Sequence, residues 1–115
     1  MRVLLATGLW AVSTAVLACE RNEYGVFEDI ACAAEAVENA RKEMESVLDN
    51  LAARLDPEVR EALEKAQAAW SDYREAAVQF VYAQEGGSSG RLVVANDTER
   101  AIRARTEELK QWQPQ

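Results

Sequence analysis

Residues 55–59, Leu55-Asp56-Pro57-Glu58-Val59, decide the fold because they separate two long segments with helical periodicity. Proline disfavours helical geometry in the residue before it and fits the first turn of a new helix. Asp56 is therefore expected to cap the second helix, with Glu58 near its positive end. A tight connection between two long helices predicts an antiparallel helical hairpin.

The segment before this connection has apolar residues at alternating steps of four and three, which is the pattern of a helix in a bundle. These residues are Ala33, Val37, Ala40, Met44, Val47, Leu51 and Leu55, with Leu48 widening the stripe. Asp29 is the expected N-cap, and Cys32 lies in the first turn. No Gly or Pro interrupts the segment after Asp29, so the sequence predicts one continuous helix.

The segment after the connection repeats the pattern, and we expect its apolar residues to face the core. They are Val59, Leu63, Ala66, Trp70, Tyr73, Ala77 and Phe80, extended by Gln84 and broadened by Val78 and Val81. Residues 86–90, Gly-Gly-Ser-Ser-Gly, end this helix. Gly86 suits the left-handed position after a helix, and Ser88 or Ser89 could cap the next one.

Residues 91–112 can be read in two ways. Leu92-Val93-Val94 alone resembles a strand, whereas the apolar residues from Leu92 to Trp112 fit one helical face. A lone strand would have no partner, so we predict a third helix with an irregularity near Asn96. The fold class is therefore all-α, an antiparallel three-helix bundle formed by a helical hairpin plus a third helix.

Residues 1–18 have the features of a secretory signal peptide. Arg2 gives a positive end, an uncharged run follows from Val3 to Leu17, and small residues suit cleavage at either Ser13/Ala15 or Val16/Ala18. The run is short for a membrane span, which needs about 20 apolar residues, although a signal-anchor is the alternative. We therefore expect a secreted or periplasmic protein whose domain is 19–115. Residues 20–28 are expected to form an irregular arm before the first helix.

The two cysteines, Cys19 and Cys32, are an even count in an exported chain, which favours one disulfide. The alternative is a lipoprotein, because Val16-Leu17-Ala18-Cys19 loosely resembles a lipobox with Cys19 as the lipidated residue. Lipidation would leave Cys32 unpaired, and Leu17 stands where a small residue is usual. Pairing explains both cysteines, and a membrane contact is expected only through the signal or a lipid on Cys19.

The charge and the missing residue types exclude several functions. Residues 1–18 hold one basic residue and no acid, so the chain without them has 12 Lys and Arg against 20 Asp and Glu, a net charge of −8. This balance argues against nucleic acid and anionic membranes and is compatible with a cationic partner. The chain has no histidine, which removes the common triads and histidine metal sites. We expect no catalytic residues, no metal and no cofactor.

Gln67, Trp70 and Arg74 share one helical face in the middle of the second helix. We expect Trp70 to pack in the core and Arg74 to pair with an acid of the first or third helix while its stem covers Trp70. Gln67 is expected to bind a neighbouring group and fix the register of the helices.

The order of these features resembles the N-terminal domain family of LprI-type lysozyme inhibitors, which are small exported bacterial domains. The first matching feature is the cysteine pair, Cys19 and Cys32, with Glu28 before the second cysteine. The second is the Gln-x-x-Trp-x-x-x-Arg signature, formed here by Gln67, Trp70 and Arg74. The turn Gly87-Ser88 follows, and the last helix matches at Arg105, Thr106 and Leu109. Many members carry two further cysteines, which residues 75–78 and 94–96 lack here.

This resemblance implies an exported, non-catalytic binding module with a cationic protein such as a lysozyme as its partner. It also implies that the signature residues are structural and that Cys19–Cys32 is a retained bridge. The alternative is a lipid-anchored accessory protein of the bacterial envelope with no lysozyme-related activity.

Overall fold

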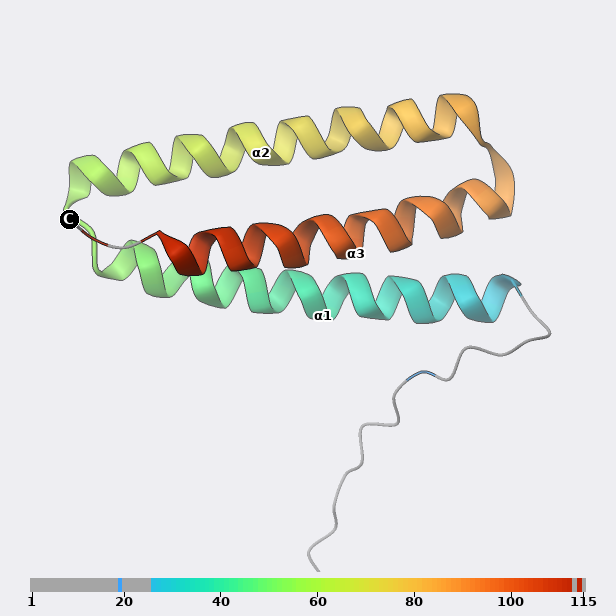
Figure 1. Ribbon diagram of the computed structural model, residues 1–115, viewed down its shortest axis with the longest axis horizontal. Helices are drawn as coiled ribbons and strands as arrows, with labels where there is room; N and C mark the ends of the chain where they lie inside the picture. Colours follow the sequence, from blue (N-terminus) through green and yellow to red (C-terminus); the bar gives the residue numbers. More distant parts are fainter. Residues whose placement is uncertain (1–18, 20–25, 113, 115) are drawn as a thin grey trace, which may run out of the picture.

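The computed structural model describes Cys19, residues 26–112 and Pro114. This part of the chain forms three helices, α1 Val26–Ala53, α2 Pro57–Gln84 and α3 Gly87–Gln111, with no strand among the described residues. Successive helices run in opposite directions, so α1 and α3 point the same way (Figure 1). The predicted all-α three-helix bundle is confirmed. The predicted signal peptide, residues 1–18, lies outside the described residues.

The core lies mainly between α1 and α3, which pack closely along their length. Its fully buried apolar side chains are Cys32, Ala33, Ala40, Met44 and Leu51 of α1, Leu63 of α2, and Ile102 and Leu109 of α3. Ala33 and Ala40 are almost completely covered, and their small side chains allow the two helix backbones to approach closely. The helix α2 supplies one fully buried apolar residue and is therefore the most loosely packed of the three.

The first helix begins earlier than predicted. α1 starts at Val26, so Asp29 lies inside the helix and the N-cap assignment was wrong. Residues 26–28 of the predicted irregular arm are helical, while residues 20–25 lie outside the described part. The physical reason is that Gly25 is the first residue upstream that strongly disfavours helix, so nothing in residues 26–28 stops the helix there.

Cys19 and Cys32 lie at disulfide distance, with their Cα atoms 5.3 Å apart, as the cysteine count predicts. The bridge joins Cys19 to a buried position in the second turn of α1.

The connection between α1 and α2 is fastened by a side chain that the sequence analysis missed. Asp56 is the N-cap residue with extended backbone, as predicted, but its carboxylate makes no capping hydrogen bond. Instead the Arg60 guanidinium donates from Nε to the Ala52 carbonyl at 3.0 Å and from Nη2 to the Leu55 carbonyl at 3.1 Å. The Ala52 carbonyl lies in the last turn of α1 and also accepts from the Leu55 N–H at 3.2 Å, and Leu55 follows the helix end, where carbonyls lack the usual helical donors. Arg60 thus joins the start of α2 to the end of α1.

The turn between α2 and α3 uses its glycines differently from the prediction. Gly86 is the extended N-cap of α3 (φ −93°), Gly87 has a left-handed φ of 70°, and the two serines lie inside the helix rather than capping it. Gly90 is buried, and a Cβ there would lie 2.0 Å from the backbone oxygen of Glu85. The third helix is continuous past Asn96, so the predicted irregularity is absent.

The predicted core face of α2 was wrong at four positions, one of which is Gln84, an exposed residue at the end of the helix. Leu63 is buried and Trp70 is half-buried, but Val59, Tyr73 and Phe80 have 51%, 66% and 64% of their surface exposed. The apolar residues of α2 form two adjacent stripes, and the stripe that contains Leu63 and Trp70 is the one that packs against the rest of the bundle.

Candidate functional site

The signature residues Gln67, Trp70 and Arg74 occupy successive turns of α2, and all three side chains are half-buried. Arg74 donates from Nη2 to Asp97 Oδ2 of α3 at 3.1 Å, and its side chain is only 15% exposed. The sequence predicted that Arg74 pairs with an acid of the first or the third helix, and the partner is Asp97 of the third helix. Trp70 packs against the edge of the core rather than at its centre.

Gln67 links α2 to both other helices. Its amide nitrogen lies 3.7 Å from Met44 Sδ of α1, and its oxygen accepts a hydrogen bond from Arg105 Nε of α3 at 3.1 Å. Since thioether sulfur is a weak acceptor, the bond with Arg105 is the stronger of the two. Together with Arg74–Asp97 it joins α2 to α3 on both sides of Trp70.

Arg105 is the central side chain of this cluster. It is 7% exposed, and its guanidinium carbon lies 5.8 Å from the centroid of the Trp70 ring and 4.8 Å from that of Trp112. Nη1 donates to the Glu108 carboxylate one turn further along α3. The sequence signal for Arg105 was weak, because apolar periodicity does not predict a buried cation; only its match to the family pattern pointed to it.

A groove runs between α1 and α2, and Thr98 and Ile102 of α3 line one part of it. One part, about 360 Å³, is lined by Met44, Leu48, Gln67 and Trp70, and an adjoining part of about 220 Å³ reaches Arg74, Val78 and Ile102. Both parts share Arg41, Met44, Trp70 and Ser71, so they form one surface. We call it the α1–α2 groove. Its floor is apolar and aromatic, since Met44 and Trp70 lie at its centre.

Three carboxylates at the edge of the groove have no cationic partner among the described residues: Glu45, Glu64 and Glu75. The acids of α3 differ, because each is ion-paired. Asp97 pairs with Arg74 and Arg100, Glu99 with Arg103, Glu107 with Lys110, and Glu108 with Arg105. Of the two arginines at the groove, Arg41 lies 3.8 Å from Glu38 and Arg74 binds Asp97. Part of the uncompensated negative charge of the described residues thus lies beside the groove, and other unpaired acids, such as Glu35, Glu58 and Glu85, lie outside it.

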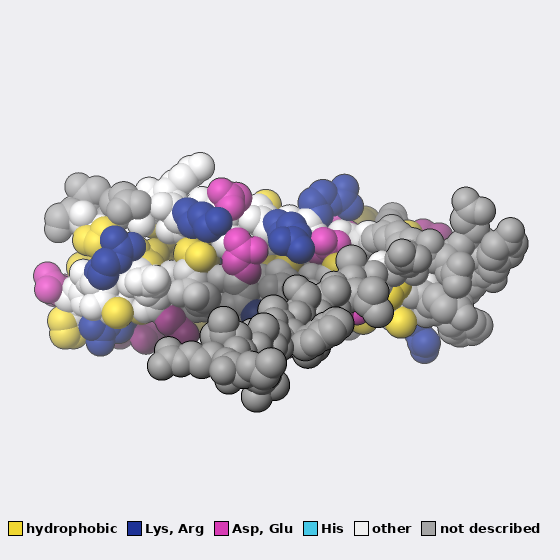
Figure 2. Space-filling model, turned by 90° about the horizontal axis from the view of Figure 1, so that it is seen from below, with side chains coloured by type: hydrophobic (Ala, Val, Ile, Leu, Met, Phe, Trp, Pro, Cys, Tyr) yellow, Lys and Arg dark blue, Asp and Glu magenta, His cyan; other side chains and the backbone are white. Residues whose placement is uncertain are grey.

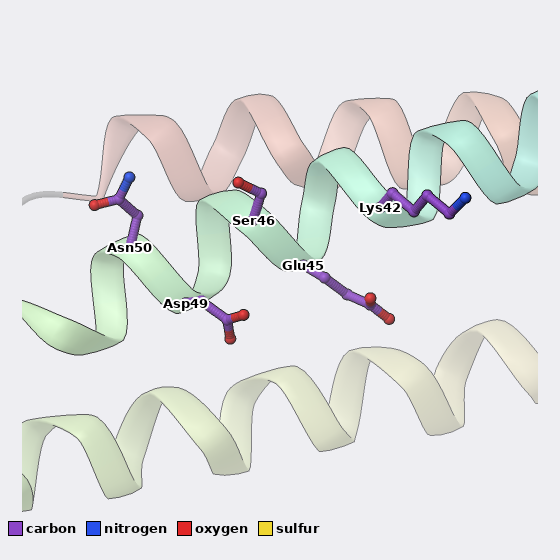
Figure 3. Close-up of a pocket in the computed structure, with 5 residues that line it drawn as sticks. All are labelled: Lys42, Glu45, Ser46, Asp49 and Asn50. Carbon is purple, nitrogen blue, oxygen red and sulfur yellow. The ribbon is translucent and has the colours of Figure 1, made fainter.

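Figure 3 shows that the acidic edge continues along α1. Glu45 and Asp49 extend on the side of α1 that faces α2 in this view, whereas Ser46 and Asn50 lie on the side of α3. These residues and Lys42 line an open depression on a single helix, which suits a protein surface better than an enclosed small substrate. In the space-filling view from the α1 side, basic and acidic side chains are interspersed (Figure 2). Glu45, Glu64 and Glu75 therefore form one local group of unpaired acids, at the edge of the groove.

The described residues hold no group of three or more His, Cys, Asp or Glu side chains arranged to bind a metal ion. A search of the same residues finds no helix with the length and apolar character needed to cross a membrane.

A family model described as lysozyme inhibitor LprI matches residues 19–109. The chain belongs to the LprI family. The matched region includes both cysteines, the Gln67–Trp70–Arg74 signature and Arg105, whereas Trp112 follows it. Searches of the curated proteins and of the solved structures give no match.

Proposed function

We propose that this LprI-family protein is an exported, non-catalytic binding module that inhibits a lysozyme-like cationic enzyme, and that it binds this enzyme through the α1–α2 groove. The observation that carries the proposal is the LprI match over residues 19–109. In this proposal residues 1–18 direct export, and 19–115 form the inhibitor domain of the bacterial envelope or periplasm.

The groove has the chemistry to bind lysine and arginine side chains. Their apolar stems can lie along Met44 and Trp70, while their charged ends reach the unpaired carboxylates of Glu45, Glu64 and Glu75. A cation over the Trp70 ring adds roughly 0.5–2 kcal/mol of attraction, depending on how far it is desolvated. A half-buried aromatic surrounded by polar groups is also the usual composition of a binding hot spot.

The net charge supports the same partner. A chain with a charge of −8 after removal of residues 1–18 attracts a cationic enzyme over distances of about 10 Å at 0.1 M salt. We therefore expect association to be fast at low ionic strength and to slow as salt is added.

The signature residues have a supporting role in this proposal. Gln67 and Arg74 fix α2 against α3, which holds Trp70 at the floor of the groove. The contacts that Gln67 and Arg74 make within the bundle account for these two residues. Of the three signature residues, we therefore propose that Trp70 alone touches the partner.

The test is inhibition of cell-wall lysis by a lysozyme, with protein expressed with residues 1–18 so that export and processing occur. The groove variant, E45Q/E64Q/E75Q, removes the three unpaired carboxylates. The matched control variant, E35Q/E58Q/E85Q, removes three exposed acids that lie outside the groove and changes the net charge equally. We expect the groove variant to inhibit at least about tenfold more weakly, and the control variant within about threefold of the original protein.

The outcomes separate the two parts of the proposal. Failure of the unaltered protein to slow lysis or to co-elute with lysozyme at low salt would refute the lysozyme function. If the groove variant and the control variant lose the same amount of inhibition, the net charge of the protein determines inhibition and the groove does not.

The lipobox-like sequence Val16–Cys19 supports a second candidate, a lipid-anchored accessory protein of the envelope. The intact mass of the exported protein distinguishes the two. A mass lower by two hydrogens than the reduced chain 19–115 fits the Cys19–Cys32 bridge, whereas a diacylglyceryl addition would establish the anchor.

A further inference from the structure

The exposed apolar residues of α2 form a second surface, distinct from the groove. Val59, Ala66, Tyr73 and Phe80 recur at every seventh position, and three of them have more than half of their surface exposed. Four alanines, Ala62, Ala69, Ala76 and Ala83, recur at the same interval between them and are exposed. We call these two series the outer stripe. Such a stripe, apolar at alternating steps of three and four, is the pattern of a helix with a partner helix.

The described residues leave most of the outer stripe uncovered, although its first members, Val59, Ala62 and Ala66, line an open pocket with Leu51, Leu55 and Trp112. Ser71 lines the groove, and Ala69 belongs to the outer stripe. The two residues are two positions apart, so their side chains point about 200° apart around the helix axis. The outer stripe therefore faces away from the groove. Leu63, which packs in the core, lies between these two surfaces. Apolar surface of this extent on a soluble domain usually marks an interaction site.

The arrangement of large and small residues selects the occupant. When two copies of α2 lie antiparallel, residues of one series face residues of the other wherever the helices overlap, and Phe80 and Ala83 extend past the overlap in the register described below. Tyr73 then lies over Ala62 of the second copy, and Val59 over Ala76. In a parallel pair large residues would face large ones and alanines would face alanines, which leaves clashes and gaps. The stripe is thus complementary to itself in one direction only.

Charges beside the stripe select the register. Glu58, Lys65, Asp72 and Gln79 follow the stripe on its solvent side at intervals of seven. In one register Ala66 of each copy faces Ala69 of the other. Lys65 of each copy then lies beside Asp72 of the other, so the pair occurs twice, once on each side of the two-fold axis. A shift of one heptad would instead place Asp72 beside Asp72. Among the described residues Lys65 pairs with Glu61 at 3.3 Å, and because both side chains are largely exposed, Lys65 can turn to a second copy.

We propose that the protein forms an antiparallel homodimer through the outer stripe of α2, in the register that pairs Lys65 of each copy with Asp72 of the other. The symmetry is two-fold, so the same surface serves both copies. The contact extends over about 30 Å of helix, which is less than a standard stable interface, so we expect a dissociation constant of roughly 10–100 μM.

The test is sedimentation equilibrium of the purified protein from about 5 to 500 μM, which spans the expected dissociation constant. We expect a monomer at the low end and a dimer at the high end. Ala69→Glu places two carboxylates near the two-fold axis, and we expect it to be monomeric throughout. Because Ala69 is exposed, its helical circular dichroism and melting temperature should match the unaltered protein, which separates lost association from lost folding. A monomer at 500 μM for the unaltered protein would overturn the proposal.

A charge exchange tests the register. Lys65→Asp and Asp72→Lys should each weaken the dimer by about fivefold or more, and the double variant should restore it to within about twofold. Lys42→Asp, on the exposed face of α1, is the matched control for Lys65→Asp and should leave the dimer unchanged. Additive losses in the double variant would overturn the proposed pairing. Since the outer stripe faces away from the groove, the Ala69→Glu variant is expected to inhibit lysozyme within about threefold of the unaltered protein.

Discussion

At the scale of single residues, Arg105 has the most demanding surroundings in the bundle. It is a buried cation between two indole rings, with a hydrogen bond to Gln67 and an ion pair with Glu108. A planar guanidinium can stack on both rings and donate in two directions, which a lysine ammonium cannot do. The stability of the α2–α3 contact therefore depends on this residue type.

We expect Arg105→Ala to lower the free energy of unfolding by about 2–3 kcal/mol, because it removes both cation–π contacts and leaves Gln67 without its donor. Urea denaturation measures the loss. Arg103→Ala is the control: Arg103 lies on the same helix, its side chain is 50% exposed, and its ion pairs contribute about 0.5 kcal/mol or less. Equal losses in the two variants would contradict the account.

Trp70 is half-buried, so its truncation should remove less stability than that of a fully buried aromatic. We expect Trp70→Ala to lower the free energy of unfolding by about 2–3 kcal/mol, below the 3–5 kcal/mol typical of core positions. Trp70→Phe should keep most of the stability and still weaken lysozyme binding, because the ring presented to the partner is smaller and lacks the indole N–H. A Trp70→Phe protein with unchanged inhibition would place Trp70 outside the binding surface.

At the scale of secondary-structure elements, the α2–α3 turn depends on one glycine. Gly90 lies in the first turn of α3, where its Cα faces the carbonyl of Glu85. We expect Gly90→Ala to destabilise the protein by roughly 2 kcal/mol or more, since the added Cβ would overlap backbone rather than a flexible side chain. Gly86→Ala is the matched control, because its Cβ would meet open space and its φ is negative. Thermal unfolding of both variants gives the comparison, and a Gly90→Ala protein as stable as Gly86→Ala would show that the turn is adaptable.

The three helices could be predicted from the sequence because apolar periodicity and the Asp56-Pro57 connection are local features. The burial of α2 could not, because its apolar residues form two adjacent stripes and periodicity does not determine which one packs. Tyr73 and Phe80 were therefore assigned to the core although they lie on the outer stripe. The α1–α2 groove could not be predicted either, since it exists because α2 packs on α3 more closely than on α1.

At the scale of the whole molecule, the Cys19–Cys32 bridge closes a loop between residues 13 apart. A loop of this length is expected to add about 3 kcal/mol to the free energy of unfolding by restricting the unfolded chain. We expect the Cys19→Ala/Cys32→Ala protein to keep its helical circular dichroism and to unfold at lower urea concentration. Reduction of the unaltered protein should have a similar effect. An unchanged urea midpoint in both cases would mean that the bridge does not restrict the unfolded state.

The central claim is that this LprI-family protein binds a cationic lysozyme through the unpaired carboxylates of its α1–α2 groove. Isothermal titration calorimetry of the purified protein with lysozyme, at about 0.02 and 0.5 M salt, tests it most directly. We predict one saturable binding event at low salt, with an affinity at least about tenfold weaker at high salt. The groove variant E45Q/E64Q/E75Q should bind about tenfold more weakly, whereas the control variant E35Q/E58Q/E85Q should bind with an affinity close to that of the original protein. The absence of binding at low salt, or binding that the groove variant leaves unchanged, would contradict the claim.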